Sequence, residues 1–158
     1  MKEQKKVYLF LIKFFIIFLI LSFIIELVNL SFLTEFITFI SASYLGLDFV
    51  GSTIFVGVST FIVTNSCTGL VSGAVLIALL FAGKMPTLGK KFFITIFGVC
   101  LLLLINIPRV MLVLLFAKVG YDADLVHTIT WFVMSGIVLL IWYYGNKAVG
   151  IKNFNELV

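Results

Sequence analysis

Strongly apolar runs separated by short polar segments make up most of this chain. The runs cover residues 7–30, 68–81, 92–118 and 127–144. A helix needs about 20 predominantly apolar residues to cross the hydrocarbon layer of a bilayer. The pattern therefore predicts an all-α integral membrane protein with about four transmembrane helices.

The stretch between the first two runs has a different pattern. Residues 31–44 mix Phe and Ile with Ser, Thr and Glu, which predicts an amphipathic helix lying on the membrane surface. Residues 45–64 combine three glycines with many β-branched side chains, which favour short strands around a turn, such as a short β-hairpin. Because unpaired strands cannot lie in lipid, we expect this stretch to form a small extracytoplasmic cap. The alternative is an additional span, which would invert the orientation of everything after it.

Two local signals refine the predicted helices. Ser66 is of a type that caps helix N-termini, so we expect the second span to begin at the polar hexapeptide 64–69. In the third span, Pro108 lacks a backbone donor and leaves a carbonyl without its partner. We therefore expect a kink near Leu104.

The composition supports the membrane class. Hydrophobic residues make up 63% of the chain and charged residues only 11%, whereas a soluble domain has about 25% charged residues. We interpret residues 1–158 as a single membrane-embedded domain. Two cysteines make no disulfide framework. The N-terminal run is longer than the roughly 7–15 residues of a signal-peptide core, which indicates a retained anchor.

The distribution of charge predicts the orientation of the spans. If both termini are cytoplasmic, most of the basic residues fall on the cytoplasmic side: Lys2, Lys5, Lys6, Lys84, Lys90, Lys91, Lys147 and Lys152. The predicted outer segments carry the acidic residues Glu35, Asp48, Asp122 and Asp124. This is the positive-inside pattern of a multi-pass protein of the cell membrane. It accounts for the net charge of +4 without a nucleic-acid partner.

This orientation brings three chemically capable residues to one level of the membrane. Cys67 lies at the outer start of the second span, and His127 at the outer start of the fourth. Arg109 lies 18 residues beyond Lys91, or about 27 Å along a helix, which is close to the full hydrocarbon thickness. We therefore expect the three side chains to meet at the extracytoplasmic face.

These residue types suit nucleophilic chemistry on a carbonyl. A thiolate is the reactive form of cysteine, and a helix N-terminus stabilises it. An imidazole can accept the proton of the Cys67 thiol and pass it to a leaving amine. A guanidinium such as that of Arg109 can stabilise a developing oxyanion. Asp122 and Asp124 offer too few ligands for a metal site, so we expect neither metal nor cofactor.

Each residue also has a structural interpretation. A lone cysteine is more often a small buried side chain than a nucleophile, and His127 could be an interfacial residue beside Trp131. Asn106 could serve only to satisfy backbone groups freed by Pro108. Arg109 is harder to explain in this way, because a charge inside an apolar helix is costly and marks a functional site by default.

The ordered set of motifs resembles the exosortase/archaeosortase family. The matching elements are Cys67-Thr68-Gly69 opening a helix, Asn106-Ile107-Pro108-Arg109 late in the next helix, and His127 after a short loop. The resemblance covers residues 50–145. It implies a membrane cysteine transpeptidase or protease in which Cys67 is the nucleophile, Arg109 the stabiliser and His127 the acid/base. The predicted supporting residues are Asn65, Thr68, Gly69 and Asn106.

The resemblance also implies a substrate class. Such enzymes act on secreted proteins that carry a C-terminal signal made of a short motif, a transmembrane helix and a basic tail. They cleave near the motif and pass the new C-terminus to a lipid or other acceptor, such as an amine. Two other interpretations stay open: a non-enzymatic membrane assembly factor or small transporter or channel subunit, and a thiol-using lipid acyltransferase.

Overall fold

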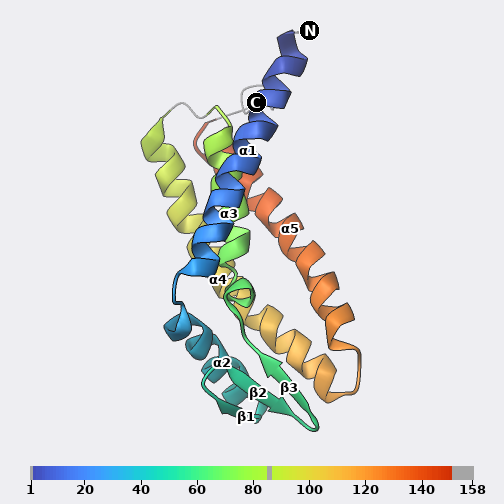
Figure 1. Ribbon diagram of the computed structural model, residues 1–158. Helices are drawn as coiled ribbons and strands as arrows, with labels where there is room; N and C mark the ends of the chain where they lie inside the picture. Colours follow the sequence, from blue (N-terminus) through green and yellow to red (C-terminus); the bar gives the residue numbers. More distant parts are fainter. Residues whose placement is uncertain (1, 85–86, 151–158) are drawn as a thin grey trace.

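The computed structural model of the protein describes residues 2–84 and 87–150 (Figure 1). The predicted cytoplasmic position of Lys152 falls outside this range. The elements that the described residues form are α1 (Lys2–Leu27), α2 (Ser31–Leu45), β1 (Asp48–Val50), β2 (Thr53–Val56), β3 (Ser59–Ile62), the 3-10 turn η1 (Asn65–Thr68), α3 (Leu70–Ala82), α4 (Leu88–Lys118) and α5 (Ala123–Ala148).

The predicted helical fold is confirmed in outline, and its long apolar helices are compatible with a membrane protein. Within the described residues, three helices are long and apolar enough to cross a membrane, namely α1, α4 and α5. The second predicted span, residues 68–81, corresponds to α3, which has 13 residues and reaches only about 20 Å. The helix α4 continues through Pro108 without interruption. Figure 1 shows its axis changing direction partway along its length.

Helix α3 is the centre of the bundle. It packs against α1, α4 and α5, and its side chains Leu76 and Leu80 are fully buried in a cluster with α4 and α5. Small residues allow the close approach. A Cβ on Gly98 of α4 would collide with Leu76, and one on Gly145 of α5 would lie 2.7 Å from Ile94. Glycines at helix contacts are typical of packing in membrane proteins, where backbones approach closely.

The segment between α1 and α3 folds into a separate lobe made of α2 and a three-stranded antiparallel sheet of order β1-β2-β3. The predicted short strands in residues 45–64 are therefore correct, and the alternative of an additional span is wrong. The sheet has one strand more than a hairpin. Buried side chains of α2 and β2, with Leu114 of α4, form a second apolar core. Figure 1 shows this lobe beyond the end of α1.

Charges of opposite sign gather at opposite ends of the molecule. Lys90 lies at the start of α4 and donates from Nζ to the carbonyl of Val149, at the end of α5, so these ends are adjacent. Figure 1 places the start of α1 at the same end. The acidic residues Glu35, Asp48, Asp122 and Asp124 are all exposed and belong to the elements at the other end.

Candidate functional site

Cys67 lies in the 3-10 turn η1 and not in the first turn of an α-helix. The predicted helix start at the hexapeptide is therefore wrong by about one turn. Gly69 adopts a left-handed conformation with φ of 88° and separates η1 from α3, which begins at Leu70. Ser66 does not cap α3; its hydroxyl donates to Glu26 Oε1 at 2.9 Å. The thiol of Cys67 accepts a 3.5 Å hydrogen bond from the hydroxyl of Thr64.

Gly69 meets two requirements that together exclude other residues. Its positive φ is one that L side chains rarely adopt. In addition, a Cβ at this position would lie 2.9 Å from the Cβ of Asn106 in α4. The junction between η1 and α3 therefore lies directly against the polar stretch of α4, which fixes Cys67 relative to Asn106.

The predicted supporting residues Asn65 and Thr68 hold the turn in place. The amide of Asn65 donates to the carbonyls of Ile25 at 2.9 Å and Val28 at 3.2 Å, near the C-terminal end of α1. The hydroxyl of Thr68 is buried and donates to the carbonyl of Asn65 at 2.6 Å. Asn65 thus joins the turn to the end of α1, and Thr68 bonds to the backbone of the turn itself.

Asn106 and Arg109 connect Cys67 to α4 and α5. Asn106 is fully buried; its amide donates to the Cys67 carbonyl at 2.6 Å, and its Oδ1 accepts from Arg109 Nη1 at 3.1 Å. Arg109 Nε donates to Thr130 Oγ1 at 3.2 Å. Asn106 therefore has a larger role than satisfying backbone groups near Pro108.

His127 lies against the guanidinium of Arg109. Nη2 of Arg109 is 3.5 Å from Nδ1 and 3.4 Å from Nε2 of the imidazole. The indole Nε1 of Trp131 donates to His127 Nε2 at 2.9 Å. Because an indole N–H can only donate, Nε2 accepts here, and the ring is assigned as neutral with its proton on Nδ1.

Sequence reasoning missed three residues of this site. The sequence points to Trp131 only as a neighbour of His127, yet its ring also faces the guanidinium carbon of Arg109, which lies 5.4 Å from the ring centroid. Thr130 and Trp131 follow His127 at i+3 and i+4, which is the spacing that places side chains on one helix face, so the sequence did carry a signal. Thr64 precedes Cys67 by three residues, and only the tight turn brings its hydroxyl to the sulfur.

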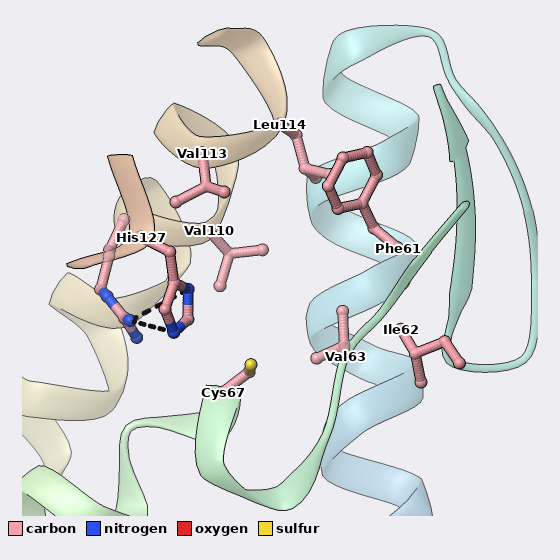
Figure 2. A pocket seen from close by; sticks show the side chains of 9 residues that line it. Phe61, Ile62, Val63, Cys67, Val110, Val113, Leu114 and His127 are labelled. Carbon is pink, nitrogen blue, oxygen red and sulfur yellow. Dashed lines mark hydrogen bonds between the residues drawn. The ribbon is translucent and has the colours of Figure 1, made fainter. Parts of the chain in front are cut away.

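The structure brings Cys67, Arg109 and His127 to one small pocket of about 80 Å³. Its other walls are apolar and come from two elements: Phe61, Ile62 and Val63 at the end of β3, and Val110, Val113 and Leu114 of α4. Figure 2 shows the sulfur of Cys67 directed into this space, with Val63 on one side and His127 on the other. The sheet thus forms one wall of the site, as expected for a cap.

The arrangement can polarise and attack a carbonyl in a largely apolar environment. Cys67 is not in a disulfide and is partly accessible, and it is close enough to Arg109 for an electrostatic interaction. Arg109 is 8% exposed, so its charge is only weakly screened by solvent. Over the described part of the chain, His, Cys, Asp and Glu form no group of three or more that could hold a metal ion.

Comparisons of the chain with protein-family models, with curated proteins and with solved structures gave no match. The resemblance to exosortases and archaeosortases therefore rests on the sequence motifs alone.

Proposed function

We propose that this protein is a membrane-embedded cysteine transpeptidase or protease. Its substrates are secreted proteins with a C-terminal sorting signal, and its acceptor is a lipid, an amine or water. The observation that carries the proposal is the convergence of one thiol, one guanidinium and one imidazole, from η1, α4 and α5, on a single pocket. A buried arginine inside an apolar helix is costly and by default marks a function.

The proposed reaction has two steps. The sulfur of Cys67 attacks the scissile carbonyl carbon, the C–N bond breaks, and a thioester forms. The thiol proton passes to His127 and then to the leaving amine, while Arg109 stabilises the oxyanion. A hydroxyl, amine or water acceptor then attacks the thioester carbon while His127 takes its proton, the C–S bond breaks, and the proton returns from His127 to the sulfur of Cys67.

The contact between His127 and Trp131 has a consequence for this reaction. The Nε2 lone pair that would accept the thiol proton faces the indole N–H of Trp131. Proton transfer therefore requires His127 to exchange its Trp131 partner for the thiol. The charge carried by the imidazolium is then close to Arg109, which favours rapid transfer of the proton onward to the leaving amine.

The proposed reaction takes place at the extracytoplasmic face. The separation of lysines from acidic residues along the molecule supports this orientation, because basic residues are enriched on the cytoplasmic side. The four-span topology of the proposal counts α3 as a short span within the bundle. The side of the membrane on which Cys67 lies can be measured by labelling Cys67 in intact cells with a thiol reagent that does not cross membranes.

Matched cysteine variants test the proposed activity. Cys67→Ala should abolish processing, and Cys67→Ser should nearly abolish it. Cys100→Ala should have no effect, because Cys100 is exposed on α4 and does not line the pocket. The readout is the intact mass of membrane-anchored secreted proteins in cells that carry each variant. Full processing by the Cys67→Ala protein would reject the mechanism.

A non-enzymatic role is the second candidate, and one observation favours it. Every nitrogen of the Arg109 guanidinium has a partner within the protein: Asn106, Thr130 and His127. Such a network could serve only to hold η1, α4 and α5 together in an assembly factor or a small transporter subunit. Alkylation by iodoacetamide separates the two roles. A nucleophile should be alkylated rapidly, with a pH dependence shifted to lower pH than that of an ordinary thiol, whereas a structural cysteine should be inert.

A further inference from the structure

The strand β3 is a free edge of the sheet that leads directly to Cys67. Its only partner is β2, in an antiparallel register that pairs Val56 with Ser59 and Thr53 with Ile62. Among the described helices and strands, only β2 has Cα atoms within 8 Å of those of β3. The opposite edge strand, β1, packs against α2. Within the described part of the chain, the edge of the sheet at β3 is therefore open.

The alternation of hydrogen-bonded pairs between β2 and β3 decides which backbone groups of β3 point away from the sheet. In a hairpin with a two-residue loop, the pair beside the loop exchanges both hydrogen bonds, and the pairs then alternate. Ser59 and Phe61 thus bond to β2. Val63 continues the same alternation, because its N–H donates to the Ser52 carbonyl at 2.8 Å. The N–H and C=O groups of Thr60 and Ile62 face away from the sheet. Outside the ladder, no described residue supplies a hydrogen bond to them.

The open edge and the reactive sulfur share one pocket. Phe61, Ile62 and Val63 form its β3 wall, and Cys67 lies five residues beyond Ile62 (Figure 2). A strand paired with Thr60 and Ile62 advances about 3.3 Å per residue. Continued past Ile62, its backbone would enter the pocket that Cys67 also lines. Its alternate side chains would face the apolar wall that Val110, Val113 and Leu114 provide.

We propose that the substrate peptide binds in extended form as a fourth strand on β3, through the outward N–H and C=O groups of Thr60 and Ile62, and so delivers its scissile carbonyl to Cys67. A small aliphatic side chain of that peptide enters the pocket. Backbone hydrogen bonds supply affinity in this mode, and the pocket supplies specificity. The inference rests on the proposed function and adds to it the conformation and side-chain class of the substrate.

The test uses a peptide that reports on β3 and Cys67 together. The probe is acetyl-tetraalanyl chloromethyl ketone, which alkylates a thiol by forming an S–CH₂ bond and releasing chloride. Two isomers carry an N-methyl group on the second or on the third alanine. The protein is the full chain with Cys100→Ala, purified in lipid nanodiscs, so that Cys67 is its sole cysteine. Iodoacetamide is the non-peptide reference.

One of the two N-methyl isomers should react about tenfold more slowly than the parent, the effect of one lost hydrogen bond, while the other reacts at close to the parent rate. This alternation follows because neighbouring amides of a strand point in opposite directions. Equal rates for the two isomers, whether fast or slow, would overturn the edge-strand inference and leave the nucleophile standing. A Cys67 inert to every reagent would overturn the proposed function as well.

A proline variant provides the complementary measurement from the side of the protein. Proline at Thr60 removes an outward N–H without breaking a bond to β2, and edge strands tolerate proline there. For Thr60→Pro, the ratio of the peptide rate to the iodoacetamide rate should fall about tenfold, again the effect of one lost hydrogen bond. An unchanged ratio would contradict the pairing.

Discussion

The two halves of α4 pack in opposite ways. In the half that faces the bundle, Ile94 and Leu102 join a wholly apolar cluster with α3 and α5. About one and two turns beyond Leu102, Asn106 and Arg109 form hydrogen bonds to η1 and α5. Lipid is as apolar as the bundle core, so the first half is held mainly by shape and close packing. The second half is held by directional bonds, which specify geometry as well as stability.

Loss of the Arg109 guanidinium, in the polar half of α4, should have the largest of the expected effects. Arg109→Ala removes the proposed oxyanion donor and leaves Asn106 Oδ1 without its Nη1 partner. Processing should fall by about 10²–10³-fold, as for other lost oxyanion donors. Arg109→Lys keeps the charge and loses the forked geometry, so it should recover only part of the activity. The measurement is the rate of appearance of the cleaved product by mass spectrometry, and processing at the wild-type rate would contradict the assigned role.

Two leucines on α4 test whether packing stabilises the half of this helix that faces the bundle. Leu102 is fully buried, whereas Leu104 is 65% exposed. Leu102→Ala should lower the free energy of unfolding by about 2–5 kcal/mol because it leaves a cavity. Leu104→Ala should change it by about 0.5 kcal/mol or less. Thermal unfolding in nanodiscs gives both values, and equal losses for the two variants would show that burial in the bundle does not determine stability.

A pair of glycines tests the junction between the two halves. Gly69→Ala places a Cβ at positive φ and 2.9 Å from Asn106, so it should cost about 1–3 kcal/mol. Gly136 lies in α5 with open space around it, and Gly136→Ala should be neutral or stabilise by up to about 1 kcal/mol. The same unfolding assay compares them. A tolerated Gly69→Ala would mean that η1 does not need its close contact with α4.

The smallest expected effect comes from one hydroxyl of the network. Thr130→Val preserves side-chain shape and removes the acceptor of Arg109 Nε, which should cost about 0.5–1.5 kcal/mol. Thr128→Val is its matched control, because Thr128 is exposed and its hydroxyl bonds only to the carbonyl of Asp124. Unfolding and processing should both change less for Thr128→Val. Larger changes for Thr128→Val than for Thr130→Val would place the important hydroxyl outside the hydrogen-bond network of Arg109.

The sequence predicted the site better than it predicted the local structure around Cys67. Helix rise placed Arg109 level with Cys67, and Asn106 and Arg109 do lie against the Cys67 turn. The same reasoning assigned Ser66 as a cap and put Cys67 in the first turn of a helix. That failed because Asn65 and Ser66 instead bond to the end of α1, some 40 residues earlier in the chain. Local capping preferences cannot register such a distant partner.

By itself, the sequence determined the membrane class, the three long apolar helices and the strands of the lobe, because each follows from local composition and periodicity. Tertiary structure alone decided that the α5 face with Thr130 and Trp131 meets Arg109 of α4, and that β3 forms a wall of the pocket. These depend on which faces of separate elements meet. Packing of the whole chain settles that choice, and no single segment contains it.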